Sequence, residues 1–298
     1  MPMLITGATG FVGRRLVERV QRPVVLSRNA ARAQEVLGDV TAYEWSPQRE
    51  PPPAAALESV DAIVHLAGES IAAGRWTAER KRRIRESRVV GTEQLVAGLA
   101  SLARRPAVLV SASAVGYYGS RGDEWLDETS SPGDDFLAHV CRDWEQAALA
   151  ANELGMRVVL LRLGVVLGPR GGALEKMLPI FRLGLGGRLG SGRQWMPWVH
   201  LDDVVGLALR ATQDSSLAGP VNVVGPTPVT NREFTQALAA VLHRPAWFPA
   251  PAFALKLAVG EFSETLLGSQ RVMPRVAQQA GYAFQHADVK SALTASVG

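Results

Sequence analysis

Short apolar runs alternate with helical patterns along the first two thirds of the chain. The runs are rich in β-branched residues and lie at 3–6, 24–26, 62–66, 108–110 and 158–161. Helical patterns lie between them at 11–20, 30–37, 77–103 and 135–154. Continuous hydrophobicity is typical of parallel strands covered on both faces, and strand–helix alternation predicts right-handed crossovers. We therefore expect an α/β fold built on a doubly wound parallel Rossmann sheet.

The pattern changes after residue 163. Glycine-dense segments at 168–172 and 183–193 break the alternation and indicate loops that cover a site. The segment at 198–204 predicts a short strand and a helix capped by Asp202, and 221–224 predicts a strand that returns to the sheet. Beyond residue 225 the chain is mostly helical, with a capping box from Thr230 to Glu233.

Two structural units follow from these patterns. We predict a dinucleotide-binding domain over 1–170, to which 198–224 return, and a smaller, mostly helical substrate lobe formed by 171–197 and 225–298. Residues 51–56, PPPAAA, are expected to form a linker.

Composition limits the classes of protein that fit. The 298 residues are 47% hydrophobic, which supplies a sizeable core. A single cysteine, Cys141, excludes an internal disulfide. Because no basic, apolar leader and no bilayer-length apolar stretch occurs, we expect a cytoplasmic protein without membrane contact. The five histidines show no metal-ligand spacing, so no metal is predicted.

The net charge of +4 includes a basic run at 75–88. Such a run is a possible nucleic-acid contact, but Glu79 and Glu86 interrupt it and it continues into a helical pattern. We interpret it as the solvated face of a helix and expect no nucleic-acid partner.

The first apolar run leads directly into a glycine-rich turn that opens a helix. Glycine at 7 permits a sharp turn, at 10 it lets backbone approach a pyrophosphate, and at 13 it lets the helix pack closely on the sheet. The free N–H groups of the helix then face the phosphates. The expected dinucleotide contacts are Gly7, Thr9, Gly10, Phe11, Val12 and Gly13.

The end of the second run indicates which dinucleotide binds. Enzymes that use NAD usually carry an acidic residue there for the ribose 2′-hydroxyl, whereas a 2′-phosphate needs a cation. This chain has Arg28 at that position. We therefore predict NADP (NADPH) as the cofactor.

Several further segments carry a family resemblance. They are His65-Leu66-Ala67-Gly68, Val89-Val90-Gly91-Thr92, Val110-Ser111-Ala112-Ser113, Tyr118-Gly119 and Trp198-Val199-His200-Leu201-Asp202-Asp203. Together with the glycine turn they resemble the extended short-chain dehydrogenase/reductase superfamily. The segments at 164–168 and 181–187 and the C-terminal region are similar to its atypical, cell-division-inhibitor-like epimerase-family proteins. The resemblance implies further cofactor contacts at Leu66, Ala67, Gly68, Ser111 and Gly164.

The same resemblance implies a catalytic serine, a tyrosine and a lysine four residues after the tyrosine. In typical members the tyrosine exchanges the proton, the lysine lowers its pKa and the serine orients the substrate oxygen. Ser113 occupies the serine position. Aligning the helix on Trp144-Glu145 places Leu137 and Cys141 where tyrosine and lysine belong, and neither can do that chemistry.

Other residues are candidates for the missing roles. Tyr117 or Tyr118 follows Ser113 closely enough to reach the same cleft, and Arg88, which replaces a usual asparagine, is a candidate cation. The alternative is that the tyrosines only pack. Lys176 and Arg193 are candidate contacts for an anionic substrate group; for Lys176 a solvated side chain is an equal alternative.

These observations lead to two functional hypotheses. The first is an NADP-dependent oxidoreductase or epimerase, monomeric or homodimeric, that acts on a nucleotide sugar or another small hydroxy or carbonyl compound. The second is an NADP(H)-binding regulatory protein that no longer turns over. Both predict NADPH binding, but only the first predicts hydride transfer.

Overall fold

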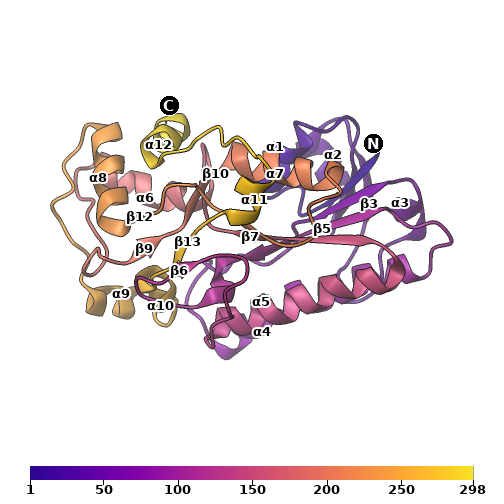
Figure 1. Ribbon diagram of the computed structural model, residues 1–298, viewed down its shortest axis with the longest axis horizontal. Helices are drawn as coiled ribbons and strands as arrows, with labels where there is room; N and C mark the ends of the chain where they lie inside the picture. Colours follow the sequence, from indigo (N-terminus) through magenta and orange to yellow (C-terminus); the bar gives the residue numbers. More distant parts are fainter. Residues whose placement is uncertain (298) are drawn as a thin grey trace.

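The computed structural model describes residues 1–297. Its centre is a seven-stranded parallel sheet in the order β11-β7-β5-β4-β1-β2-β3 (Figure 1). The strands are β1 (Met3–Thr6), β2 (Val24–Ser27), β3 (Thr41–Glu44), β4 (Ala62–His65), β5 (Val108–Ala114), β7 (Arg157–Leu163) and β11 (Gly219–Val223). The predicted α/β fold and doubly wound parallel sheet are confirmed. The strand order reverses between β1 and β4, and ligands of such sheets bind beyond the carboxyl ends of the strands at this point.

The strand β3 was not predicted from the sequence. It lies at the edge of the sheet, where only β2 pairs with it. None of its four residues is buried, so no apolar run marks it in the sequence. An edge strand of this kind forms because its partner supplies hydrogen bonds, not because its own side chains need burial.

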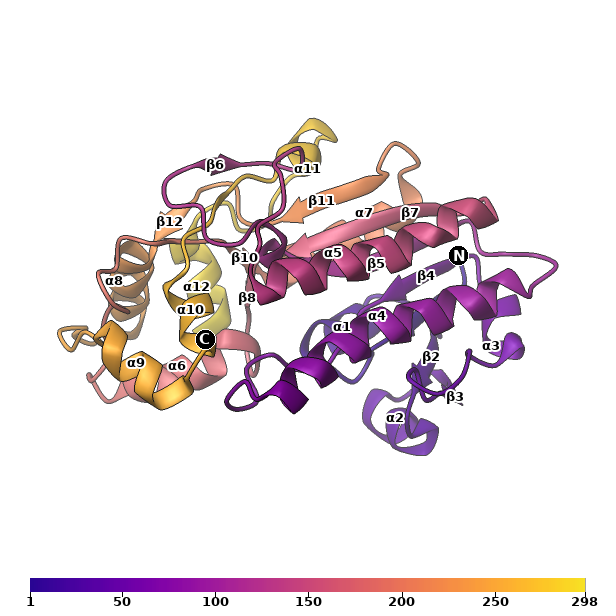
Figure 2. The same ribbon diagram turned by 90° about the horizontal axis from the view of Figure 1, so that it is seen from below.

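Helices cover both faces of the sheet (Figure 2). One face packs against α1 (Phe11–Val17), α2 (Ala30–Leu37), α7 (Leu201–Gln213) and α11 (Arg275–Gln279). The other packs against α3 (Ala54–Glu58), α4 (Ala78–Ala100), α5 (Phe136–Leu149) and the 3₁₀ helix η2 (Ala150–Leu154). The prediction of a linker at 51–56 is wrong from Ala54 onward, because α3 begins there and buries Ala56 and Leu57.

A smaller, mostly helical lobe lies beside the sheet, as predicted. Its core surrounds Trp198 and Phe234. The helices are α6 (Gly172–Arg182), α8 (Asn231–Leu242), α9 (Ala252–Val259), α10 (Phe262–Leu267) and α12 (Val289–Val297). Short strand pairs are β8 (Val165–Leu167) with β10 (Trp198–His200), β9 (Trp195–Met196) with β12 (Val229–Thr230), and β6 (Trp125–Leu126) with β13 (Arg271–Val272). The residue boundaries given above for the two units stay a prediction.

The two predicted helix caps had different outcomes. The capping box between Thr230 and Glu233 is present at the start of α8. At α7 the N-cap is His200, not Asp202: the His200 Nδ1 accepts the Asp202 N–H at 3.1 Å. Asp202 lies inside the first turn, where its carboxylate favours the positive end of the helix.

A buried histidine joins β1, β4 and α4 beneath the glycine turn. Thr6 Oγ1 lies 2.7 Å from His65 Nδ1, and His65 Nε2 lies 3.0 Å from Thr92 Oγ1. Thr92 donates its proton to the Arg88 carbonyl oxygen, so it accepts from His65 Nε2, and Nδ1 accepts from Thr6. Thr6 Oγ1 also accepts the N–H groups of Leu66 and Ala67. Burial lowers the pKa of His65 to about 4, which keeps the ring neutral.

We expect His65 to make the free energy of unfolding depend on pH between about 4 and 6.5. The unfolded chain protonates His65 near 6.5 while the folded chain does not, so stability is complete above this window and decreases as pH falls through it. The loss is on the order of 3 kcal/mol at most. Urea unfolding of wild type and His65→Gln across this range checks it. His200 contributes in the same direction, so the variant should show a smaller slope, and an unchanged slope would contradict the prediction.

A buried ion pair joins β7 to α5. The Arg162 guanidinium donates to Glu145 Oε1 from Nε and to Oε2 from Nη2, both at 2.8 Å. The two side chains are only 4% and 7% exposed. Burial opposes the charge of Arg162, but the hydrogen bonds and charges of Glu145 and Tyr118 together outweigh it and raise the pKa of Arg162 above its ordinary value. Arg162 therefore keeps its charge in the interior.

Removing one partner of this pair should destabilise the protein strongly. Glu145→Leu leaves a buried guanidinium unpaired, which costs about 3–5 kcal/mol of unfolding free energy. Adding Arg162→Met removes that charge and should restore part of the loss. Urea unfolding of both single variants and the double variant measures the coupling. The exposed pair Arg82–Glu86 provides the control, since Glu86→Gln should change stability by less than about 1 kcal/mol; a similarly small effect of Glu145→Leu would refute the role of the pair.

Candidate functional site

The glycine turn after β1 packs against the end of β4. Gly7 has φ +67°, and a Cβ there would lie 2.8 Å from the carbonyl carbon of Leu66. A Cβ on Gly13 would overlap the carbonyl oxygen of Gly7. A side chain at position 10 would be a tight fit but could be accommodated, since its Cβ would lie 3.1 Å from that oxygen. Side chains are therefore excluded where the turn doubles back, which leaves its backbone open to a ligand.

The start of α1 has no side-chain cap. Gly10 is its N-cap, and Thr9 and Gly10 are exposed. Val12 and Phe11 are half-buried. The Phe11 ring lies under the loop at 168–172, where a Cβ on Gly171 would come within 2.5 Å of it. Phe11 therefore positions that loop beside the turn.

Arg28 lies at the same edge of the sheet. Thr6 and Leu26 are paired in the parallel ladder, so Gly7 and Arg28 follow neighbouring strand ends. The Ser27 hydroxyl and the Asn29 side chain fix the backbone around Arg28. Its side chain is exposed, and within residues 1–297 it makes no hydrogen bond or ion pair.

The other predicted cofactor residues have different surroundings. Leu66, Ala67 and Gly68 leave β4 next to the glycine turn, and Gly68 is exposed. Gly164 is a close-contact position, since its Cβ would lie 2.6 Å from the Pro197 carbonyl oxygen. Ser111 has no exposed surface and its hydroxyl donates to the carbonyl oxygen of Ala112. This placement does not support a contact between Ser111 and a cofactor.

Ser113 and Tyr118 both belong to the buried network around Arg162. The Ser113 hydroxyl donates to Glu145 Oε1 at 2.6 Å. The Tyr118 hydroxyl donates to Asn222 Oδ1 at 2.7 Å and accepts from Arg162 Nη1 at 3.0 Å. Burial raises the pKa of Tyr118 to about 12, although Arg162 opposes the rise. Tyr118 is fully buried and keeps its proton, so its placement favours a structural role.

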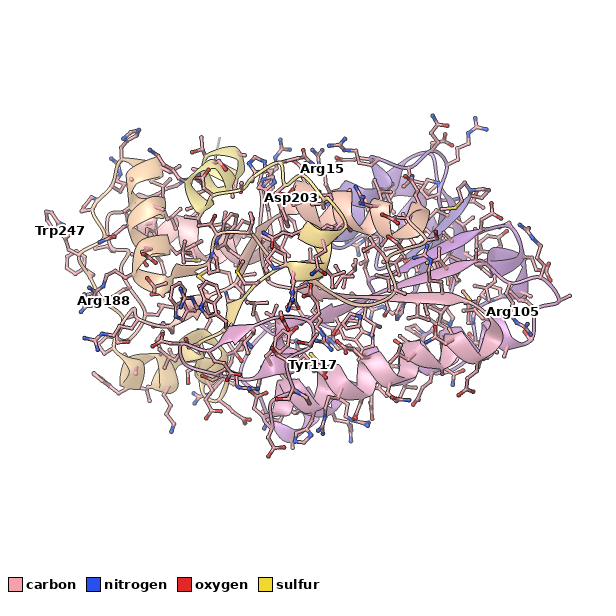
Figure 3. The ribbon with its side chains drawn as sticks, in the orientation of Figure 1. Arg15, Arg105, Tyr117, Arg188, Asp203 and Trp247 are labelled. Carbon is pink, nitrogen blue, oxygen red and sulfur yellow. The ribbon has the colours of Figure 1, made fainter. Side chains whose placement is uncertain are left out.

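Tyr117 differs from its neighbour. Its ring is half-buried and lies under the Arg162 guanidinium, 3.5 Å from the ring centre. Its hydroxyl makes no hydrogen bond with any of residues 1–297. Figure 3 shows Tyr117 beside α5, near the junction of the two lobes. Of the two tyrosines, Tyr117 has the hydroxyl that remains available.

The α5 side chains that pack against this segment do not supply a general acid. The short 3₁₀ helix η1 (Val115–Tyr118) packs on Leu137 and Cys141: a Cβ on Gly116 would lie 3.3 Å from Leu137 Cβ and 3.7 Å from Cys141 Sγ. Burial raises the pKa of the Cys141 thiol to about 12. Leu137 and Cys141, which the family resemblance aligns with tyrosine and lysine, therefore serve packing.

Sequence reasoning missed residues that hold η1 in place. Gln270 Nε2 donates to the carbonyl oxygens of Val115 and Gly119, at 2.8 and 3.0 Å. Arg162 could have been found, because a charge interrupts the apolar run at 158–163. Nothing in the sequence around Gln270 signals its contact, since its partners lie 151 and 155 residues away.

Lys176 and Arg193 are both exposed and lie in the smaller lobe. Lys176 Nζ donates to the Ala72 carbonyl oxygen at 2.6 Å, which connects α6 to the loop after β4. The Arg193 guanidinium makes no hydrogen bond within the described part of the chain. Neither side chain contacts the Ser113–Tyr118 segment by a hydrogen bond.

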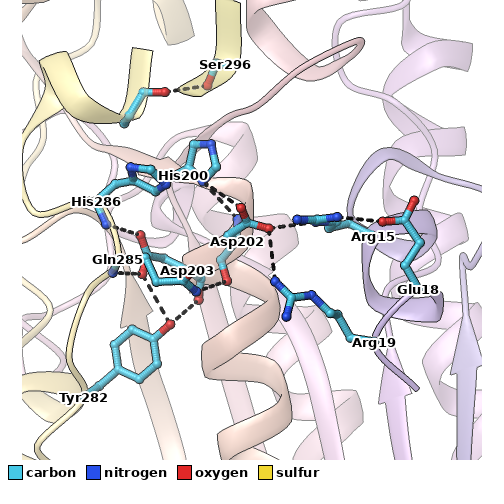
Figure 4. Close-up of polar contacts among 11 residues, drawn as sticks. Arg15, Glu18, Arg19, His200, Asp202, Asp203, Tyr282, Gln285, His286 and Ser296 are labelled. Atoms are coloured by element: carbon cyan, nitrogen blue, oxygen red, sulfur yellow. Dashed lines mark hydrogen bonds and ion pairs between the residues drawn. The ribbon is translucent and has the colours of Figure 1, made fainter. Parts of the chain in front are cut away.

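A cluster of polar side chains connects α1, α7 and the C-terminal segment (Figure 4). Potential ligand atoms of His200, Asp202 and His286 lie within 4.8 Å of one another. However, His200 Nδ1 accepts the Asp202 N–H, and the Asp202 carboxylate accepts from Arg15 Nε at 2.7 Å. With these lone pairs used and a guanidinium adjacent, the cluster is a poor cation site. It serves instead to hold α7 against α1.

Comparison with known proteins shows related chains. Residues 3–225 match the NAD dependent epimerase/dehydratase family, and residues 250–296 match a domain of unknown function, DUF1731. An Arabidopsis thaliana chloroplastic homologue of epimerase family protein SDR39U1 is 42% identical, over 99% of this chain and 86% of its own. No helix within residues 1–297 is both long and apolar enough to cross a membrane.

Two solved structures add detail. The human epimerase family protein SDR39U1, crystallised with NADPH, has a TM-score of 0.89 and 33% identity over 99% of this chain and 98% of its own. A nucleoside-diphosphate sugar epimerase from Corynebacterium glutamicum has a TM-score of 0.74 and 34% identity; all of this chain aligns with 59% of that one. The chain belongs to the NAD dependent epimerase/dehydratase family and carries a C-terminal DUF1731 domain.

Proposed function

We propose that the protein binds NADP(H) and acts as an oxidoreductase or epimerase on a nucleotide sugar or another small hydroxy or carbonyl compound. One observation carries the proposal: the side-chain-free turn at Gly7 and Gly13 lies at the same sheet edge as the unpaired Arg28. The turn fits a pyrophosphate and Arg28 fits a 2′-phosphate. NADPH in the human relative and the name of the Corynebacterium relative support the cofactor and the substrate class.

Arg28 should determine the preference between the two dinucleotides. A guanidinium–phosphate contact is worth about 1.5–3 kcal/mol, so wild type should bind NADPH roughly 10- to 100-fold more tightly than NADH. Arg28→Asp should shrink or invert this preference, because a carboxylate repels the phosphate and accepts from the ribose hydroxyl. Fluorescence titration measures both affinities. Arg49→Asp, another exposed arginine, controls for the change in net charge. Equal binding of NADPH and NADH by wild type would remove the argument.

Tyr117 and Ser113 are the proposed reacting groups. Bound NADP(H) would supply or accept the hydride. Tyr117 would exchange the proton through its free hydroxyl. Ser113 would orient the substrate oxygen, which requires its hydroxyl to turn away from Glu145. The Glu145 carboxylate tolerates the loss of this hydrogen bond, since Arg162 still donates two hydrogen bonds to it.

Substitution of Tyr117 tests this assignment. With a panel of nucleotide sugars and small carbonyl compounds, Tyr117→Phe should lower the rate of product formation by about 100-fold or more, in the range of lost general acid catalysis. The rate is followed as NADPH oxidation for a reduction and as epimerised product for an epimerisation. The NADPH affinity and melting temperature of this variant should stay near wild type. Tyr118→Phe should instead lower stability, because it removes the hydrogen bond accepted by Asn222 Oδ1 and the one donated by Arg162 Nη1 to the Tyr118 hydroxyl. Full activity of Tyr117→Phe would exclude Tyr117 as the proton donor.

A second candidate function is NADP(H) binding without turnover, to regulate a partner. The observation that favours it is the placement of Leu137 and Cys141 as packing residues under Gly116. The same panel, incubated with NADPH and with NADP⁺ and analysed for epimerised as well as oxidised or reduced product, separates the two functions: NADPH binding with no product above background supports the regulatory role.

A further inference from the structure

Arg88 is a half-buried arginine in the middle of α4. Its guanidinium lies between the end of β4 and α5. A Cβ on Gly68 would lie 3.3 Å from its Cζ, and its Cζ lies 5.3 Å from the ring centre of Trp144. One guanidinium nitrogen, Nη1, donates to the Ile84 carbonyl oxygen at 3.0 Å. Within residues 1–297 this is the only hydrogen bond of the group.

No carboxylate balances this charge. Within the described residues Arg88 forms no ion pair. Glu69 is near enough to raise the pKa of Arg88, but its carboxylate is bound to Arg80 Nη1 at 2.8 Å. The Cys141 thiol stays protonated, because burial raises its pKa to about 12. Glu145 is already occupied by Arg162 and Ser113.

Burial lowers the pKa of Arg88, but an arginine remains charged at neutral pH. The group is half-buried, and its unbonded nitrogens are not sealed from solvent. A partly desolvated guanidinium with free donors binds an oxyanion strongly and in a planar, two-pronged geometry.

The location of Arg88 agrees with a ligand site. Gly68, which lies over the guanidinium, follows Leu66 and Ala67, against which the glycine turn packs. Cys141, on the other side, packs under Gly116 just after Ser113. The charge therefore lies between the turn proposed for the pyrophosphate and the segment proposed for catalysis. Arg28, proposed for the 2′-phosphate, follows β2 and so lies elsewhere along the edge.

We propose that Arg88 binds an oxyanion, either a carboxylate of the substrate or a phosphate of the dinucleotide, between Gly68 and Cys141. This inference rests on the proposed function for the origin of the ligand. It rests on the structure alone for the binding of an oxyanion.

Stability without ligand supplies the first test. If Arg88 awaits an anion, Arg88→Met removes an unpaired charge, and its melting temperature without ligand should be unchanged or higher by roughly 2–4 °C. Arg82→Met, on the exposed side of the same helix, controls for loss of a surface arginine. A marked fall in Arg88→Met alone would indicate a structural cation and would overturn the proposal.

Binding supplies the second test, at constant ionic strength. Sodium oxalate, sodium pyrophosphate and NADPH are titrated separately into wild type, Arg88→Met, Arg88→Lys and Arg82→Met. Arg88→Met should weaken binding of at least one of them about 10-fold or more, Arg88→Lys should keep part of it, and Arg82→Met should match wild type. Loss of oxalate binding with NADPH retained assigns a substrate carboxylate. Loss of NADPH binding assigns a cofactor phosphate.

Two results have separate meanings. If all three compounds bind wild type and Arg88→Met equally, or if none binds wild type, the oxyanion site does not exist. If oxalate or pyrophosphate shows the Arg88 dependence but wild type does not bind NADPH, the site stands and the proposed function fails.

Discussion

The buried pair of Arg162 and Glu145 is the interaction on which the surroundings of the site depend. It joins β7, the second strand from one edge of the sheet, to α5, and each partner makes further hydrogen bonds. Glu145 fixes the Ser113 hydroxyl at the end of β5, and Arg162 fixes Tyr118 in η1. Tyr118 in turn holds Asn222 of β11, which donates to the Met273 carbonyl oxygen in the smaller lobe. Together these hydrogen bonds hold the backbone of the segment from Ser113 to Tyr118 in place.

The same network explains why the hydroxyl groups of two neighbouring tyrosines differ in their availability to a substrate. Tyr118 is used inside the protein, with its hydroxyl bonded on both sides. Tyr117 offers only its ring to Arg162, so its hydroxyl remains outside the network. Gln270 strengthens the distinction, since it binds the carbonyl oxygens on either side of η1 and keeps the turn from rotating. The smaller lobe therefore contributes to the order of the site from a distance of about half the sequence.

The sequence indicated the sheet, the cofactor turn and Arg28, because these rest on local patterns. Continuous apolar runs predict buried strands wherever the runs exist, and β3 was missed because it has none. The site was harder to predict from the sequence than the fold, for a physical reason. Whether Ser113 or Ser111 is accessible, or which tyrosine is free, depends on partners such as Glu145 and Asn222 that lie 32 and 104 residues away. No local spacing reports those contacts. A charge inside an apolar run, as at Arg162, is the nearest available signal.

The packing of α5 against η1 bears on the role of Arg88. Leu137 and Cys141 are compact and apolar, so η1 can pack directly on the helix at Gly116. The contact itself therefore contains no charged side chain of α5. A positive charge is supplied from α4 by Arg88, which reaches between Gly68 and Trp144. A half-buried guanidinium that no carboxylate of the described residues neutralises argues that this position serves a ligand.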